Sequence, residues 1–321
     1  MPTEPRSAPL TVAVLLPCHD EGPVIGEVVA TFRAALPGAT VYVYDNNSHD
    51  DTAAQARAAG AEVRHEPMQG KGHVVRRMFA DIDADVYVLA DGDGTYDASA
   101  APNMIRKLLD ERLDMVVGVR THGDRQAYRF GHVLGNRFLT ATVRKLFDSR
   151  FRDILSGYRV MSRRFVKSFP ALASGFEIET MLTVHTLDLR LPYGELECLY
   201  SERQGSTTSK LNTYRDGFRI LATIVLLFKE IHPFRFFGIA SALLILISLG
   251  LGIPIVIEFI GTGLVPRVPT AILATGLMVL AGIGLTCGLV LDSVSGGRRE
   301  MKRLHYQSLP SLNHCKVEVG L

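Results

Sequence analysis

The first half of the chain alternates short apolar runs with longer amphipathic stretches. The apolar runs are rich in β-branched residues and lie near residues 11–17, 41–45, 61–66, 85–91 and 114–120. Continuous apolar strands separated by helical segments are typical of a mostly parallel sheet with helices on both of its faces. The pattern therefore predicts an α/β fold over residues 11–212, preceded by a flexible N-terminus at residues 1–10.

The second half of this domain is less regular. Residues 126–149 are expected to form an amphipathic helix, and a mixed region of strands and helices follows to about residue 203. A chain of 321 residues has room for one substantial domain and an appendage. We therefore interpret this region as part of the same domain rather than as a second one.

The C-terminal third is markedly more apolar. The segment 213–232 has one apolar helical face, formed by Phe218, Leu221, Val225 and Phe228. This periodicity indicates a helix lying at a membrane interface, although a helix packed in a soluble core would show it too. Two apolar stretches at 236–260 and 269–291 follow, each long enough to cross a hydrocarbon core of about 30 Å. We expect a transmembrane hairpin within residues 235–292, with a buried hairpin of a soluble protein as the alternative.

Basic residues lie outside this hairpin. The loop between the two spans carries only Arg267, whereas the flanks carry Lys229, Arg235, Arg298, Arg299, Lys302 and Arg303. The positive-inside rule then places both flanks in the cytoplasm, together with the α/β domain and a basic tail at 293–321. The first nine residues contain three prolines and no apolar run of signal-peptide length, which agrees with a cytoplasmic N-terminus.

Overall charge and cysteine content exclude several classes of function. A formal net charge of +2 provides no extended basic field, so no nucleic-acid partner is expected. The four cysteines lack C-x-x-C spacing, and they indicate neither a zinc site nor a disulfide framework. Any recognition of phosphate must therefore come from local basic clusters.

Polar residues gather directly after three of the predicted strands, at 17–21, 45–48 and 91–97. In sheets of this kind ligands bind beyond the carboxyl ends of the strands, so the three clusters should share one cleft. The last cluster contains Asp91 and Asp93, and residues i and i+2 at a strand end point the same way. Both carboxylates can then bind Mg²⁺ or Mn²⁺, and such a cation would hold a diphosphate group and neutralise its charge. A simple turn between strand and helix is the alternative.

Four ordered motifs carry a family resemblance. P-C-H-D-E at 17–21, D-N-N-S-H-D-D-T at 45–52, G-K-G at 70–72 and D-G-D at 91–93 resemble those of inverting family 2 glycosyltransferases of GT-A fold. The motifs at 153–159, 175–179 and 202–210 are similar to those of dolichyl/polyprenyl-phosphate hexose synthases, whose bacterial members also carry a C-terminal hairpin. The resemblance covers about residues 11–220 and is specific as a set.

This resemblance implies a GT-A Rossmann-like sheet and the transfer of a hexose-type sugar, with inversion, from a UDP- or GDP-sugar to polyprenyl phosphate. It implies a membrane protein with its catalytic domain on the cytoplasmic face of a bacterial inner membrane, and a homo-oligomer is compatible with it. The implied metal ligands are Asp91 and Asp93, and the implied catalytic residues are Asp93, Arg120, Asp153 and Arg203. The implied donor-nucleotide residues are Pro17, Glu21, Asp45, Lys71, Asp91 and Gly92. The basic residues expected at the acceptor phosphate are Arg137, Arg203 and Lys210, with Ser209 beside them.

Several of these residues have simpler interpretations. Glu21 and Asp45 suit the hydroxyls or base of a nucleoside, but helix capping or turn formation would also explain them. Arg120 would face a phosphate or form a surface salt bridge. Glu179, a second acceptor-side candidate beside Asp153, could be an exposed helix residue. Lys71 opens a helix between two glycines, although the P-loop spacing is absent and an ATPase is not supported.

One position departs from the family pattern. Several relatives resemble D-A-D-x-Q, in which the Gln helps to hold the metal, and here Thr95 occupies that place. Asp97, water or donor phosphate oxygens then remain as sources of the third ligand.

Two other functions stay open. A processive polysaccharide synthase would use the same GT-A domain, but its Q/R-x-x-R-W motif needs a tryptophan and this chain has none. A non-catalytic membrane-anchored scaffold that binds nucleotides is the second alternative, and the intact acidic cluster argues against it. The choice of sugar and nucleotide depends on how side chains are placed within the pocket.

Overall fold

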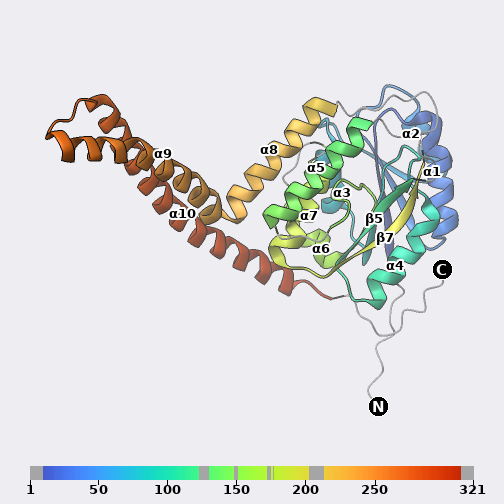
Figure 1. The fold of residues 1–321 in the computed structure, drawn as a ribbon. Coiled ribbons are helices and arrows are strands. Elements are labelled where there is room, and N and C mark those ends of the chain that lie inside the picture. The colour runs from blue at the N-terminus through green and yellow to red at the C-terminus, as the bar shows by residue number, and fades with distance from the viewer. Residues whose placement is uncertain are drawn as a thin grey trace, which may run out of the picture. The chain divides into compact units, whose positions relative to one another are not determined.

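A seven-stranded sheet forms the centre of the N-terminal region of the computed structural model (Figure 1). The structure describes residues 10–122, 130–147, 151–171, 175, 177–201 and 213–311, of which 122, 130–138 and 213–216 are described by their backbone alone. The sheet is built from β1 (Val12–Cys18), β2 (Thr40–Asp45), β3 (Glu62–His65), β4 (Val86–Leu89), β5 (Met115–His122), β6 (Arg159–Ser162) and β7 (Tyr193–Tyr200).

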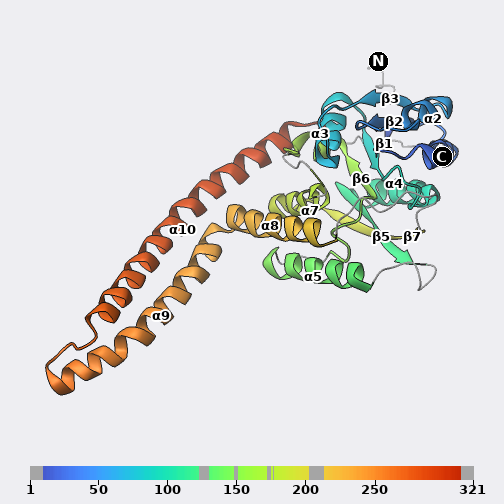
Figure 2. The same cartoon turned by 90° about the horizontal axis from the view of Figure 1, so that it is seen from above.

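The strand order is β3-β2-β1-β4-β6-β5-β7 (Figure 2). β1 runs parallel to β2 and β4, β2 runs parallel to β3, and β5 runs parallel to β7. Among these strands β6 is antiparallel to both of its neighbours, β4 and β5. The predicted mostly parallel α/β sheet is therefore confirmed, with one strand of opposite direction between its halves.

Helices cover both faces of the sheet because both faces of its central strands are apolar. The helices of this region are α1 (Gly22–Ala35), α2 (Thr52–Ala58), α3 (Lys71–Asp81), the 3₁₀ turn η1 (Ala98–Ala100), α4 (Ala101–Asp110), α5 (Phe130–Phe147), α6 (Arg163–Ser168) and α7 (Ile178–Leu189). On one face Val14 and Leu16 of β1 pack in a cluster with apolar residues of α1 and α4. On the other face Tyr87 of β4 meets Phe79 of α3, whose ring in turn meets Phe169 after α6.

The register of β1 and β2 brings the first two polar clusters together. Cys18, the last residue of β1, lies opposite Asp45, the last residue of β2. The loop after β4 approaches the same edge, because a Cβ at Gly92 would collide with Sγ of Cys18. The carboxyl ends of β1, β2 and β4 thus form one edge, as the sequence predicts.

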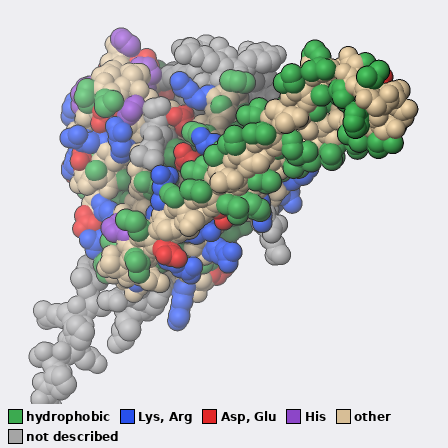
Figure 3. Space-filling view, turned by 90° about the vertical axis from the view of Figure 1, so that its left-hand side faces the viewer, with side chains coloured by type: hydrophobic (Ala, Val, Ile, Leu, Met, Phe, Trp, Pro, Cys, Tyr) green, Lys and Arg blue, Asp and Glu red, His purple; other side chains and the backbone are tan. Residues whose placement is uncertain are grey.

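Two long apolar helices follow α8 (Thr213–Ile231): α9 (Pro233–Thr262) and α10 (Val268–Ser308). They contain the predicted spans 236–260 and 269–291 and form most of a separate compact unit, residues 224–301. Only 11% and 17% of their most apolar windows is buried, so they are not core helices of a soluble domain. Figure 3 shows hydrophobic side chains over the surface of this unit.

α8 has apolar side chains on two faces rather than on one. Ile220, Ile224 and Phe228 are buried, whereas the ring of Phe218 is 74% exposed and Val225 is also exposed. The residues of the predicted apolar face thus differ in burial, and the interfacial helix stays a prediction. The exposed apolar residues remain compatible with an interfacial helix.

α10 extends beyond the second predicted span to Ser308, so the first part of the predicted tail at 293–321 is helical. Its last turns belong to the same compact unit as residues 1–223. The Tyr306 hydroxyl donates a hydrogen bond to Oδ2 of Asp114 at 2.7 Å, and Nζ of Lys302 lies 2.9 Å from Oδ2 of Asp188. The end of the membrane-type helix is thus an integral part of the α/β unit.

Candidate functional site

Asp91 and Asp93 lie in the turn that follows β4, where the strand is buried on both sides and the chain reaches the edge of the sheet. Asp93 is buried, and its Oδ1 accepts hydrogen bonds from the Thr95 hydroxyl at 2.7 Å and the Thr95 backbone N–H at 3.2 Å. Asp91 is more open, and its Oδ2 would lie 2.7 Å from a Cβ at position 157, where the chain has glycine. The hydrogen bonds from Thr95 therefore fix the orientation of Asp93, and Asp91 lies close to Gly157.

Lys71 is placed beside this turn by the start of α3. Its ammonium donates hydrogen bonds to Oδ1 of Asp91 and to Oε1 of Glu179, and all three side chains are part-buried or buried. Burial alone would lower the pKa of Lys71, but the two carboxylates raise it above its usual value, so the ammonium stays charged. Glu179, in the first turn of α7, is buried, and the interpretation of it as an exposed helix residue is wrong.

Glu21 and Asp45 lie at the ends of β1 and β2. Glu21 occupies the N-cap position of α1, but its side chain forms no capping hydrogen bond; instead its backbone N–H donates to the Thr52 hydroxyl at 2.8 Å. Oδ2 of Asp45 lies 3.5 Å from Nδ1 of His65, and its buried Oδ1 has no hydrogen-bond partner among the described residues. A buried carboxylate oxygen without a partner is costly, so a ligand donor at Asp45 would be favourable.

Arg120 and Asp153 are brought together from β5 and the segment before β6. Nε and Nη2 of Arg120 donate to the two carboxylate oxygens of Asp153 at 2.7 and 2.9 Å, and both side chains are nearly buried. The guanidinium also lies over the ring of Tyr200, 5.5 Å from its centre. Of the two predicted roles of Arg120, the salt bridge is present, but it is a buried bidentate pair between two predicted catalytic residues rather than a surface contact.

Tyr96 connects the two halves of this edge. Its hydroxyl accepts a hydrogen bond from the Gly157 backbone N–H at 2.8 Å, and its ring packs 5.2 Å from the rings of both Tyr158 and Tyr200. Burial raises the pKa of the Tyr96 hydroxyl well above its usual value, so it stays protonated. Tyr96 therefore links the acidic turn after β4 to the turn before β6.

The residues around Asp91 fit a hard divalent cation by the chemistry of their donor atoms. Mg²⁺ and Mn²⁺ prefer carboxylate oxygens, and one of the two carboxylates, that of Asp93, is already oriented by Thr95. A positive charge already lies against Asp91, that of Lys71. Asp97 is a poor source of the third ligand, because its carboxylate accepts from the Ser99 backbone N–H at 2.8 Å and from its hydroxyl at 2.6 Å to cap η1.

Four predicted site residues cannot be placed. Arg203, Ser209 and Lys210 lie outside the described residues, and Arg137 belongs to α5 at a position described by its backbone alone. Their predicted contact with an acceptor phosphate stays a prediction.

Two features of this edge were not predicted from the sequence. The first is the contact of Lys71 with Glu179, which are 108 positions apart. The second is a cluster of His19, Asp20 and His49 in the loops that follow β1 and β2. Only the strand register, which places Cys18 beside Asp45, could have indicated the second.

Comparisons with known proteins agree on one family. Residues 13–169 match the family model described as glycosyl transferase family 2. The chain is 31% identical over 301 residues to glycosyltransferase AglJ of Haloferax volcanii, covering 92% of this chain and 98% of that protein. It is 27% identical over 216 residues to dolichyl-phosphate hexose transferase of the same organism, covering 67% of this chain and 92% of that protein.

A solved structure has a similar fold. Glucosyl-3-phosphoglycerate synthase from Mycobacterium tuberculosis, in complex with Mn²⁺, uridine diphosphate and glucosyl-3-phosphoglycerate, is 26% identical with a TM-score of 0.57. The match covers 68% of this chain and 80% of that one. That relative therefore binds a divalent cation and a nucleoside diphosphate on the fold described above.

Proposed function

Since this chain belongs to glycosyl transferase family 2, we propose that it moves a hexose-type sugar from a nucleotide-sugar to a polyprenyl phosphate with inversion. The products are a sugar-phosphate lipid and a nucleoside diphosphate. The observation that carries the acceptor class is the pair of long apolar helices, α9 and α10, whose apolar windows are only 11% and 17% buried. The relative named dolichyl-phosphate hexose transferase supports the same class of acceptor.

In this proposal the donor lies along the edge formed by β1, β2 and β4. The unpartnered oxygen of Asp45 and the carboxylate of Glu21 accept hydrogen bonds from the nucleoside. Lys71 shifts from Asp91 towards the diphosphate and keeps its contact with Glu179. Gly92 lets the acidic turn approach the end of β1, so the nucleoside and diphosphate parts of the site stay adjacent.

Asp91 and Asp93 would hold Mg²⁺ or Mn²⁺, which supplies Lewis-acid stabilisation of the leaving diphosphate. Thr95 orients Asp93 for this task through its two hydrogen bonds. Asp153 fixes the plane of the Arg120 guanidinium, so positive charge faces the reacting groups without a flexible side chain having to be ordered.

The transfer is a single displacement. A lipid phosphate oxygen forms a bond to the anomeric carbon while the bond from that carbon to the diphosphate oxygen breaks, and the electron pair leaves with the nucleoside diphosphate. A phosphate monoester is already anionic at neutral pH, so no strong general base is needed. Glu179 and Asp153 are both engaged in ion pairs, which suits a positioning role for them rather than that of a nucleophile.

We place the α/β unit on the cytoplasmic face of a bacterial inner membrane. The residues before and after the apolar unit 224–301 belong to one compact unit, which supports a topology with both flanks of the hairpin on the same side. The basic residues on these flanks favour the cytoplasmic side.

The test is to incubate the detergent-purified protein with a panel of UDP- and GDP-sugars, Mg²⁺ or Mn²⁺, and undecaprenyl phosphate, with 3-phosphoglycerate as an alternative acceptor. We expect one inverted glycolipid, absent with Asp93→Asn. Transfer to 3-phosphoglycerate alone would exclude a lipid acceptor, and a polymer would indicate a processive synthase. A protein that binds a donor but neither transfers nor hydrolyses it would be the non-catalytic scaffold.

A further inference from the structure

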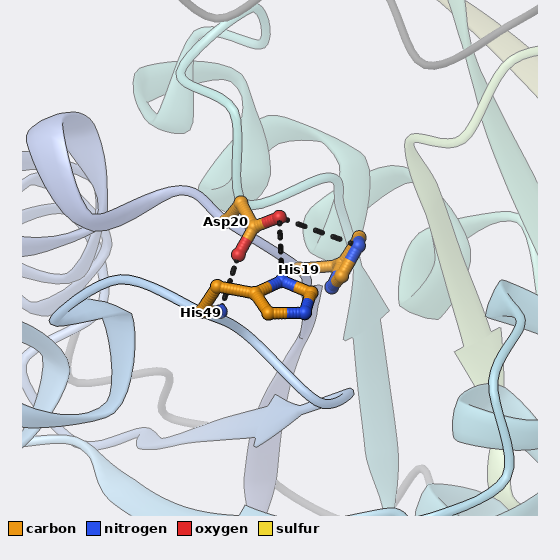
Figure 4. Close-up of side chains that lie close together, drawn as sticks. All are labelled: His19, Asp20 and His49. Atoms are coloured by element: carbon orange, nitrogen blue, oxygen red, sulfur yellow. Dashed lines mark hydrogen bonds and ion pairs between the residues drawn. The ribbon is translucent and has the colours of Figure 1, made fainter.

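His19, Asp20 and His49 form a cluster in the loops that follow β1 and β2 (Figure 4). Nε2 of His19 lies 3.4 Å from Oδ2 of Asp20, and Nδ1 of His49 lies 3.5 Å from the same oxygen. All three atoms lie within 4.8 Å of one another. None of these three residues has a role in the function proposed above.

The contacts of the two imidazoles with Asp20 have the spacing of neighbouring ligand atoms in a tetrahedral metal site. Zinc binds imidazole nitrogen and carboxylate oxygen at about 2.0–2.2 Å, so two ligand atoms of one tetrahedron lie roughly 3.3–3.6 Å apart. The two printed contacts to Asp20, 3.4 and 3.5 Å, fall within this range. Two imidazoles and one carboxylate favour a first-row transition metal over Mg²⁺, which prefers oxygen ligands.

The backbone already holds the central carboxylate in place. Asp20 has a left-handed conformation, with φ of 49°, which is uncommon for a residue other than glycine. Its backbone N–H donates to the Ser48 hydroxyl at 2.9 Å, and its Oδ1 accepts from the His49 backbone N–H at 2.6 Å. One oxygen of Asp20 therefore ties the two loops together while the other faces both imidazoles.

We propose that His19, Asp20 and His49 bind one Zn²⁺ ion, at a site formed by different residues from the carboxylate pair Asp91 and Asp93. Three protein ligands leave one coordination position for water or an incoming ligand. The ion links the loop that carries Glu21 to the loop that begins at Asp45, so it stiffens the part of the edge at which a donor nucleoside is expected. Zinc binding itself does not rest on the proposed sugar transfer.

The affinity is expected to be moderate. Metal-bound histidine normally donates its second ring N–H to a carboxylate or carbonyl, and loss of that partner costs about 10–100-fold in metal affinity. The buried Nδ1 of His19 has no hydrogen-bond partner among the described residues. The site is therefore suited to reversible occupation rather than to permanent structural zinc.

The test uses the full chain in detergent, stripped of metal and carrying Asp91→Asn and Asp93→Asn to remove the other carboxylate pair. We expect it to bind one Zn²⁺ per chain, and to give with Co²⁺ the intense visible absorption of a tetrahedral ion. His49→Ala should weaken binding at least tenfold and abolish that absorption. The His49 side chain is 86% exposed, so its removal leaves the packing intact.

His65→Ala is the matched control, because His65 is also exposed and pairs with a single carboxylate, that of Asp45. It should leave zinc binding unchanged. The proposal is overturned if the double Asn variant binds no zinc, if His49→Ala binds it as tightly as its parent, or if Mg²⁺ displaces it at equal concentration. None of these measurements requires sugar transfer, so a negative result would exclude the zinc site without bearing on the proposed function.

Discussion

Lys71 and Glu179 form a buried ion pair between α3 and α7, although the two residues are 108 positions apart in the chain. The same ammonium also contacts Asp91, so a cation bound at Asp91 has to compete with Lys71. Glu179 offers the ammonium a second partner, towards which it can move when the cation binds.

Glu179→Gln should therefore raise the divalent cation concentration required for half-maximal activity by roughly tenfold. Of the two carboxylates that contact Lys71, only that of Asp91 remains in this variant, so the ammonium competes more strongly with the cation. The measurement is sugar transfer against Mn²⁺ or Mg²⁺ concentration at saturating donor. Glu197→Gln, which removes an exposed carboxylate paired with Arg152, serves as the control and should leave the requirement unchanged. An unchanged requirement in Glu179→Gln would show that Lys71 does not compete with the cation.

Asp93→Asn should cut turnover by orders of magnitude without unfolding the protein. Asparagine keeps the oxygen that accepts from Thr95, so the turn retains its hydrogen bonds, but it loses the negative charge that the cation needs. Activity with and without EDTA, together with thermal unfolding, measures both effects. Full activity of this variant in EDTA would exclude a metal at Asp91 and Asp93.

His185 should make the α/β unit lose stability in mild acid. Burial chiefly, and the charge of Lys302 next, lower the pKa of His185 from 6.5 to about 4, and the ring lies edge-on to Phe165 and Phe169. Above pH 6.5 the ring is neutral in both the folded and the unfolded chain, and the free energy of unfolding has its full value. As the pH falls from 6.5 through 4, the unfolded chain binds the proton more readily, and the free energy of unfolding decreases by about 3 kcal/mol.

The measurement for His185 is the midpoint of thermal unfolding in detergent at pH 7 and near pH 4.5. The drop between the two pH values should be smaller in His185→Gln than in the parent. His305→Gln, which alters an exposed histidine of α10, should show the same drop as the parent. Equal drops in all three proteins would contradict the assignment to His185.

The topology prediction places both termini in the cytoplasm and only residues 261–268 on the far side of the membrane. After replacement of Cys287 and Cys315, a cysteine introduced at the exposed Thr262 should react with an impermeant reagent in intact cells. A cysteine at Ser308 should react only after lysis. The reverse pattern would refute the orientation.

Arg203→Lys tests the predicted acceptor-phosphate role of Arg203, which lies outside the described residues. If Arg203 binds a reacting phosphate through its planar fork, transfer should fall at least tenfold, about 1.4 kcal/mol of transition-state stabilisation, while membrane binding stays unchanged. If Arg203 only attracts anionic lipid, the variant should behave like the parent. Vesicle sedimentation and transfer assays on the same preparation separate the two results.

The five apolar runs predicted β1 to β5, most clearly β1 and β4, whose residues are mostly buried. The pattern did not separate out β6 and β7. Arg159 of β6 is fully buried, and its guanidinium donates to the backbone carbonyls of Ile154, Ser156 and Glu179. Because these hydrogen bonds allow a charged residue to be buried, the sequence of β6 lacks the continuous apolar run that marks the other central strands.

The strand-end residues were predictable for a different reason. A parallel sheet collects the residues after its strands at one edge, so the sequence could place Asp45, Asp91 and Asp93 near one another. It could not place Glu179, because α7 follows an antiparallel strand whose position no local pattern indicates. The cluster around Asp20 was missed because cysteine spacing was the signal for zinc, whereas this cluster consists of two histidines and an aspartate on two neighbouring loops.

The hydrogen bond from Tyr306 to Asp114 has a consequence for the order in which the protein folds during its synthesis. Asp114 directly precedes β5, and its carboxylate also accepts a hydrogen bond from the Ser162 hydroxyl, whereas Tyr306 is translated after α9 and most of α10. The α/β unit thus lacks one of its own pieces until both apolar helices have been synthesised. In the membrane topology proposed above, these helices enter the bilayer before this contact can form, so insertion precedes the final step of folding.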